Sequence, residues 1–140
     1  MWLRIIINTI FLVIQIIIYK FLSYLENQGD KCPCSNGWKL IQSKFITNIM
    51  ILLNVINIFI PLNRGLYNIP IIGGSISIIY LLLLVGELIL VYNISNELNK
   101  PDCKKCDIGD YKYLVSFFNN QSIISCIGYS IIISIVLLYF

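Results

Sequence analysis

Residues 5–25 read IIINTIFLVIQIIIYKFLSYL, an apolar stretch with a single charged side chain, Lys20. About 20 mostly apolar residues are enough for a helix to cross the hydrocarbon core of a bilayer, which is about 30 Å thick. Lys20 lies near one end of the stretch, where its long side chain can carry the ammonium group to the lipid headgroups. The stretch therefore predicts a transmembrane helix.

Three further stretches have the same character, at residues 45–62, 69–91 and 121–140. They lack the alternating pattern of a membrane barrel, and open sheet edges cannot lie in lipid because their backbone polar groups would have no partner. The sequence therefore predicts an all-α membrane protein in which residues 1–140 form a single domain of four transmembrane helices.

The composition supports this fold class and excludes others. Apolar residues make up 58% of the chain and charged residues 12%, whereas soluble domains have about 45–50% and about 25%. The net charge is +3 and the lysines lie between the apolar stretches, so no basic face for nucleic acid is expected. The chain has no histidine, so any metal site must use sulfur or carboxylate ligands.

The four predicted crossings place the loops 26–44 and 93–112 on one side of the membrane and both chain ends on the other. An excess of Lys and Arg marks the cytoplasmic side of a membrane protein. The loop side and its flanks hold eight of the ten basic residues, and Arg4 and Arg64 are on the other side. Both loops are therefore expected in the cytoplasm. The eight are Lys20, Lys31, Lys39, Lys44, Lys100, Lys104, Lys105 and Lys112.

The two loops also resemble each other in sequence. Each has a glutamate, then a pair of cysteines, then a glycine, an aromatic residue and a lysine, in nearly the same spacing. The matching residues are Glu26, Cys32, Cys34, Gly37, Trp38 and Lys39 in the first loop, and Glu97, Cys103, Cys106, Gly109, Tyr111 and Lys112 in the second. We interpret the chain as two similar helical hairpins placed side by side, an arrangement known in membrane proteins; chance similarity between short loops is the alternative.

The four loop cysteines are the candidate site. Cys103 and Cys106 have the C-x-x-C spacing of a zinc site, and Cys32 and Cys34 add a C-x-C pair. A reducing cytoplasm would leave these thiols free to bind one zinc ion, whereas an oxidising compartment would join the loops by disulfides. Either outcome is a structural clamp between the loops. Free thiols without a shared role and a redox-active dithiol are the alternatives.

Several polar residues fall inside the predicted helices, where they need partners. Glu87 is the only acid within a span, and such an acid suggests function by default. It lies towards the loop end of its helix, so a structural use within reach of water or a lysine is favoured. Cys126 belongs to a stripe of small residues and is expected to pack between helices. The amides expected to hydrogen-bond between helices are Asn8, Gln15, Asn54 and Asn57.

The first 45 residues carry a resemblance to a known group of proteins. Leu25-Glu26, the run from Lys31 to Ser35 that includes Cys32 and Cys34, and Trp38-Lys39 are similar to a segment in small multi-spanning membrane proteins of giant nucleocytoplasmic DNA viruses. The resemblance implies a structural, non-enzymatic component of a virion or of the internal membrane beneath a capsid. Its expected partners are the bilayer and other membrane or capsid proteins, and self-association stays open.

Two other functions compete with this one. Four helices with cysteine pairs in the first and third loops are similar to the quinone-linked bacterial enzymes that generate disulfides, in which the pairs Cys32/Cys34 and Cys103/Cys106 would exchange electrons. The lysine bias argues against this, because those enzymes keep their loops outside the cytoplasm. A small oligomeric pore ranks third, since few polar residues are available to line a water path.

Overall fold

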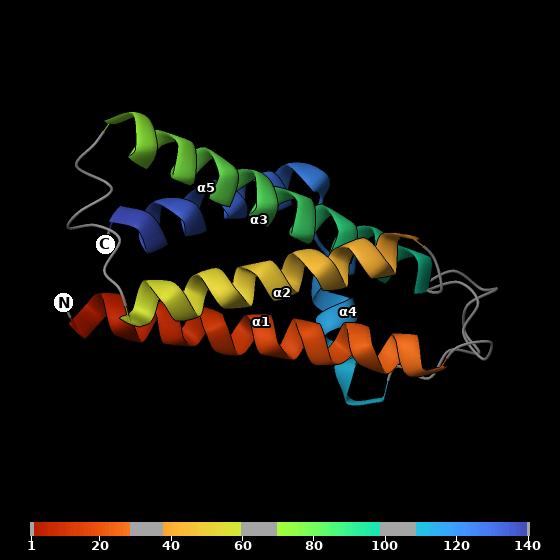
Figure 1. Ribbon diagram of the computed structural model, residues 1–140. Helices are drawn as coiled ribbons and strands as arrows, with labels where there is room; N and C mark the ends of the chain where they lie inside the picture. Colours follow the sequence, from red (N-terminus) through yellow and green to blue (C-terminus); the bar gives the residue numbers. More distant parts are fainter. Residues whose placement is uncertain (1, 29–37, 60–69, 99–108, 140) are drawn as a thin grey trace.

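The structure is a computed structural model that describes residues 2–28, 38–59, 70–98 and 109–139, and this part of the chain is helical except at residues 120–122. Figure 1 shows five α-helices and one short 3-10 helix. Their bounds are α1 Trp2–Gln28, α2 Trp38–Phe59, α3 Pro70–Leu98, η4 Gly109–Tyr111, α4 Lys112–Asn119 and α5 Ile123–Tyr139.

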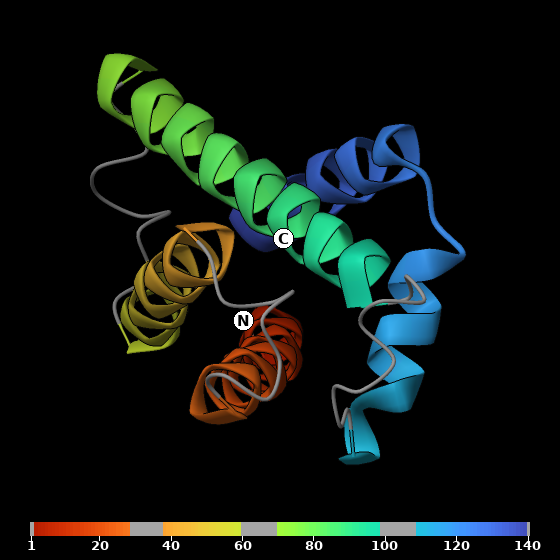
Figure 2. The same cartoon turned by 90° about the vertical axis from the view of Figure 1, so that its right-hand side faces the viewer.

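The long helices form a bundle in which chain neighbours run in opposite directions (Figure 1). Helix α2 packs against both α1 and α3, and α5 packs against α3. Viewed along the bundle, α4 lies at one side, next to both α1 and α5 (Figure 2). The first and last described residues lie at the same end of the bundle (Figure 1).

Length and composition make three of the described helices suitable for crossing a membrane. The suitable segments are Ile5–Asn27, Trp38–Phe59 and Ile78–Leu98, and a fourth span is added if α4 and α5 count as one broken span. The fold is therefore compatible with a multi-pass membrane protein, with three to four helices long and apolar enough to span.

Most buried positions of α1, α2 and α3 recur at intervals of three and four residues, and Phe21 and Ser95 are buried next to them. This is the heptad pattern of helices that wrap around one another with a left-handed twist. We call these positions the heptad seam. Its members are Asn8, Phe11, Gln15, Ile18, Leu22 and Leu25 in α1, Leu40, Ser43, Thr47, Met50, Asn54 and Asn57 in α2, and Tyr80, Leu84, Glu87, Val91, Ile94 and Leu98 in α3.

The outer surface of the described helices is unlike that of a soluble protein. The seam buries amides, hydroxyls and a carboxyl among apolar side chains, and isoleucine and leucine side chains on all four long helices are exposed. A soluble domain places most of its large apolar side chains in the interior. The apolar surface therefore indicates that lipid surrounds these helices.

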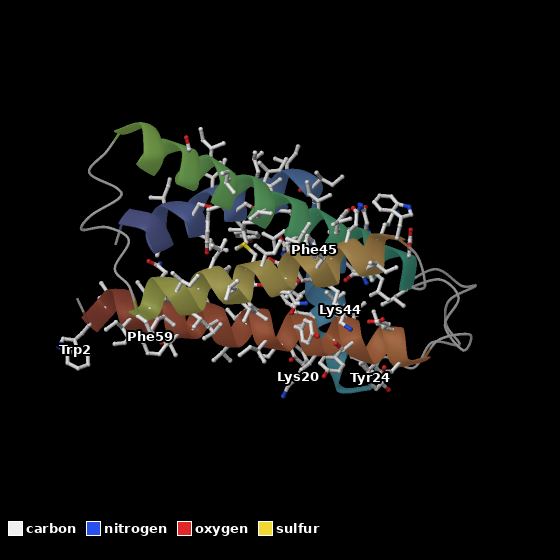
Figure 3. The ribbon with its side chains drawn as sticks, viewed as in Figure 1. Trp2, Lys20, Tyr24, Lys44, Phe45 and Phe59 are labelled. Carbon is white, nitrogen blue, oxygen red and sulfur yellow. The ribbon has the colours of Figure 1, made fainter. Side chains whose placement is uncertain are left out.

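Aromatic and basic residues mark two levels along the bundle. Trp2 and Phe59 lie at one end, and Lys20 and Lys44 lie towards the other (Figure 3). Lys20 follows Trp2 by eighteen residues, which corresponds to about 27 Å of helix and is close to the thickness of the hydrocarbon core. Aromatic residues are typical of the membrane interface, so the two levels suit its two surfaces.

The helices are longer than the predicted spans at the loop end. Helix α2 begins at Trp38, seven residues before the expected start of the span at 45. Helix α3 ends at Leu98, seven residues past the predicted end of the span at 91, in agreement with a helical sequence pattern that continues to 99. Hydropathy marks only the apolar part of a helix, whereas the heptad pattern and the ion pairs described below extend over both additional segments. Lys39 and Lys44 of the predicted loop 26–44 are therefore helical residues.

A short helix precedes the last long one. Residues 112–119 form α4, which meets α5 at an angle of 107° after a break of three residues. Val115 and Phe118 of α4 are buried in the same apolar cluster as Phe21 of α1 and Val91 of α3. Gly109 begins η4 with φ +55°, and an added Cβ would lie 3.3 Å from the Tyr24 hydroxyl oxygen, so glycine is required there.

Candidate functional site

The predicted cysteine site, Cys32, Cys34, Cys103 and Cys106, lies outside the described residues. Among the residues that are described, no three His, Cys, Asp or Glu side chains come together as metal ligands. The helices on either side of the cysteine loops are described, however: α1 ends, α2 begins and α3 ends at the same end of the bundle (Figure 1). The candidate site is therefore built from this end and from the seam behind it.

Two ion pairs join the helices at the loop end. Lys39 Nζ lies 2.9 Å from Glu97 Oε1 and links α2 to α3. Lys44 pairs with Glu26 and links α2 to α1, with its ammonium 5.4 Å from the centre of the Tyr19 ring. All four ionic side chains keep partial access to solvent, so each pair contributes at most about 1 kcal/mol. Their main effect is to fix which residues face each other.

The centre of the seam holds a carboxyl group. Glu87 is 0% exposed. Gln15 Nε2 donates to Glu87 Oε2 at 3.1 Å, and Glu87 Oε1 lies 3.1 Å from Thr47 Oγ1. The expectation that water or a lysine would reach this acid is wrong, because its seam position directs it towards α1 and α2. Glu87 thus joins three helices at one level.

The Thr47 hydroxyl contacts two oxygens in this network. Its Oγ1 is 2.7 Å from the Ser43 carbonyl oxygen as well as 3.1 Å from Glu87 Oε1. A hydroxyl has one hydrogen to donate and can accept further hydrogen bonds. Thr47 can therefore make a full hydrogen bond as donor to only one of these two oxygens at a time.

A second polar layer lies one heptad away along α1. Asn57 Nδ2 donates to Asn8 Oδ1 at 2.9 Å, which confirms the predicted bond between helices, as the Gln15 contact does for α1 and α3. The prediction is wrong for Asn54, whose Nδ2 donates to the Met50 carbonyl oxygen of its own helix at 2.8 Å. The carbonyl of the preceding turn was the nearer partner.

The sequence interpretation overlooked Ser43 and Thr47. Both are completely buried in α2, one turn apart. Hydroxyl side chains are common in apolar helices, so hydropathy gave no reason to single them out. The signal that would have found them is the three-and-four spacing they share with Met50, Asn54 and Asn57.

Two oxygens near the carboxyl have no hydrogen-bond partner among the described residues. They are Gln15 Oε1 and Ser43 Oγ, and both are buried. Each sits on a residue that takes part in the Glu87 network, through Gln15 Nε2 and through the Ser43 carbonyl. The Gln15 amide oxygen can only accept, whereas the Ser43 hydroxyl also carries a hydrogen that it can donate, so the layer holds one unused acceptor and one unused donor.

An apolar cavity of about 490 Å³ lies between α1, α4 and α5, and Gln15 is one of its lining residues. Its size falls within the range of about 300–1,000 Å³ found for small-molecule sites. Residues from each bordering helix line it, among them Phe11, Ile14, Phe117, Tyr129 and Ile133. Such a cavity can accept an apolar molecule.

Helix α5 contributes small residues to its contact with α3. Cys126, Ser130 and Ser134 are buried, whereas Ser122 of the same predicted stripe is exposed. Cys126 is a free thiol, and Ser130 Oγ donates to its carbonyl oxygen at 2.8 Å. The packing interpretation of Cys126 fits this burial.

The described geometry thus combines a hydrogen-bonded carboxyl layer, two ion pairs near the cysteine loops and an apolar cavity. The polar groups are engaged with one another across helices, which suits a bundle that must keep one arrangement in lipid. Comparison with known proteins found no matching family model, no matching curated protein and no matching solved structure.

Proposed function

We propose that the chain is a structural multi-pass membrane protein of four spanning helices, arranged as two similar hairpins with both chain ends on one side. In this proposal the two cysteine loops are clamped together by a zinc ion or by disulfides. The observation that carries it is the ion pair between Lys39 and Glu97. The extramembrane segments are too short to fold into a separate catalytic domain.

The ion pair matters because of its position relative to the cysteines. Lys39 follows Cys34 by five residues, and Glu97 precedes Cys103 by six. Six residues span at most about 20 Å when fully extended. Two loops that leave from one ion pair therefore stay within reach of each other, as a shared four-cysteine site requires.

Metal analysis of the purified protein tests the clamp. The proposal expects one zinc per chain in protein prepared under reducing conditions, and loss of that zinc in Cys103→Ser. Cys126→Ser is the matched control, because Cys126 is buried in the bundle and should leave the zinc content unchanged. Under oxidising preparation the expected product is a disulfide within one chain. Four reactive thiols without metal in either preparation would contradict the clamp.

The resemblance in the first 45 residues supports a location in a viral internal membrane, next to capsid or other membrane proteins. Loops on the cytoplasmic side, as the lysine bias predicts, would keep their thiols reduced and favour zinc. Mass spectrometry of purified particles, with and without protease treatment, tests the location. Absence from particles would remove the viral part of the proposal and leave the clamp to its own test.

A second candidate function is a quinone-linked thiol oxidoreductase, and the apolar cavity favours it. Leu114 of the cavity lining follows Cys106 by eight residues. In this reaction a dithiol becomes a disulfide, and its two electrons and two protons pass to a quinone, which becomes a hydroquinone. Polar groups of the described seam bond to one another and do not line a water path, so a pore has no comparable support.

Filling the cavity tests this second function. Ile133→Trp puts a larger side chain at a lining position, and Ile124→Trp is the control because Ile124 is 82% exposed on the same helix. Quinone reduction by a reduced dithiol partner that fails in Ile133→Trp and persists in Ile124→Trp would support the enzyme. Absence of quinone reduction in the unmodified protein would remove it.

A further inference from the structure

We propose that Glu87 is a proton-binding site, in which the bundle holds the carboxyl group as a neutral acid that donates its hydrogen to Thr47 Oγ1. The inference goes beyond the structural role proposed above and does not depend on the cysteine clamp. It rests on three observations: the burial of the carboxyl, the engagement of the nearby lysines elsewhere and the hydrogen count at Thr47.

Among the described residues, none offers a charge to balance a carboxylate at Glu87. Each lysine of the described helices is exposed or paired with another acid: Lys20 and Lys112 are exposed, Lys39 pairs with Glu97, and Lys44 pairs with Glu26. Arg4 lies about three helical turns from Gln15 along α1. The remaining titratable groups on α1, α2, α3 and α5 are weakly acidic, namely Tyr19 and Tyr24 on α1, Tyr80 and Tyr92 on α3, and Cys126, Tyr129 and Tyr139 on α5. A charged acid within a spanning helix costs up to about 2.5–3.5 kcal/mol on insertion scales, the full cost applying at the helix centre.

The hydrogen bonds close when the acid carries a proton. Thr47 then donates its hydrogen to the Ser43 carbonyl at 2.7 Å, and the acid donates to Thr47 Oγ1 at 3.1 Å. Gln15 Nε2 donates to the second carboxyl oxygen at 3.1 Å. If the group were ionised, the Ser43 carbonyl and Glu87 Oε1 would compete for the single hydrogen of Thr47.

The bound proton also has a mechanical role. It supplies the hydrogen that joins α3 to α2 at this level, while Gln15 joins α3 to α1. A carboxylate would share the single Thr47 hydrogen with the Ser43 carbonyl, in a layer where Gln15 Oε1 already lacks a donor among the described residues. The proton is therefore a structural ligand of the three-helix seam.

Infrared difference spectroscopy of the full chain in bilayers at pH 7 tests the proposal. The carbonyl stretch of a protonated carboxyl is separate from the bands of a carboxylate, so the two states can be distinguished. Glu87→Gln should remove one protonated-carboxyl band. Glu97→Gln is the matched control on the same helix and should remove carboxylate bands only, since Glu97 pairs with Lys39. Loss of carboxylate bands in Glu87→Gln would overturn the proposal.

A second variant keeps the test valid if Glu87→Gln does not fold. Thr47→Val preserves the branched shape and removes the acceptor, so the protonated band should persist and shift to higher frequency as its hydrogen bond is lost. An unshifted band would overturn the donation to Thr47. The spectra are also recorded with sodium replaced by choline. A carboxylate at Glu87 in sodium that becomes a protonated carboxyl in choline would show a sodium site instead, and would overturn the proton assignment.

Discussion

Helices α1, α2 and α3 are held together differently from α3 and α5. In the heptad seam, side chains bond across helices at the level of Asn8 and Asn57 and at the level of Glu87. Two ion pairs outside the seam join the same helices at the loop end. On α5, which packs against α3, Ser130 donates back to its own helix, and the Ser134 hydroxyl has no partner among the described residues. The first contact is specified by polar pairs and the second by small residues.

The difference shows how a bundle in lipid divides two tasks. Lipid tails are as apolar as leucine, so burial of apolar surface does little to choose one helix partner over another. Polar pairs make that choice for the first three helices, because a wrong register would leave each amide or carboxyl unpaired. Helix α5, which lacks such pairs in its described part, lies against α3 and leaves a cavity next to α1.

Removing the Glu87 side chain should give the largest difference in stability between the seam and the contact of α5 with α3. Glu87→Ala leaves a cavity and deprives Gln15 and Thr47 of their partner, so we expect a loss of about 3 kcal/mol in the free energy of unfolding. Ser134→Ala on α5 is the control and should cost less than about 0.5 kcal/mol, because its hydroxyl is buried and unpaired. Unfolding in mixed micelles, followed by circular dichroism, measures both. Equal losses would show that the two contacts are held in the same way.

A substitution at Gly109 tests how the second half of the chain is attached. Gly109→Ala must adopt φ +55° and approach the Tyr24 hydroxyl, so we expect a cost of about 1–2 kcal/mol. The centroids of the Phe21 and Tyr24 rings lie 5.4 and 5.7 Å from the centroid of the Tyr111 ring. A change in the packing of these rings should alter the near-ultraviolet circular dichroism spectrum. Gly128→Ala in α5 is the control, since open space surrounds that position. An unchanged near-ultraviolet spectrum in Gly109→Ala would contradict the attachment.

The amide layer provides a smaller effect that a double-mutant cycle can isolate. Replacing Asn8 and Asn57 by leucine, singly and together, should give a coupling energy of about 0.6 kcal/mol, the average for hydrogen bonds in a membrane bundle. The same cycle with Asn8 and Asn54 should give no coupling, because Asn54 bonds within its own helix. Coupling of equal size in both cycles would show that the layer is not specific.

The smallest effect is expected at the loop end. A cycle of Lys39→Gln and Glu97→Gln should give about 0.3 kcal/mol, since this pair is partly exposed, and salt should reduce it further. The measurement is the same micelle unfolding, repeated at low and high ionic strength. A coupling energy above about 2 kcal/mol that does not change with ionic strength would mean that the pair is more deeply buried than its exposed fraction indicates.

Part of the fold could be predicted from hydropathy. The helical class and the approximate places of all four long helices follow from apolar stretches, because lipid demands them. The ends do not follow in the same way. Lys39 and Glu97 are polar residues on helical turns beyond the apolar stretch, and their ion pair across two helices is a tertiary contact that a linear window cannot register.

The site was harder to predict for the same reason. That Asn8 and Gln15 need partners is evident from the sequence, but which partners they take depends on the register of α1 against α2 and α3. Glu87 was misjudged because its distance from the loop was counted along the chain, whereas its environment is set by the face of α3 that it occupies. The heptad spacing contained that information. The cysteine loops lie outside the described residues, so their clamp stays a prediction.

The position of Glu87 in the chain has a consequence for the order of synthesis. Both residues that bond to it, Gln15 and Thr47, are made first, because chains are synthesised and generally fold from the N-terminus. The α1–α2 hairpin, with its own Asn8–Asn57 hydrogen bond, can thus form in the membrane before α3 is inserted. Glu87, the buried acid, is thus inserted next to the hairpin face that already carries Gln15 and Thr47. In a chain with the opposite order of helices, the acid would enter the lipid before its hydrogen-bond partners.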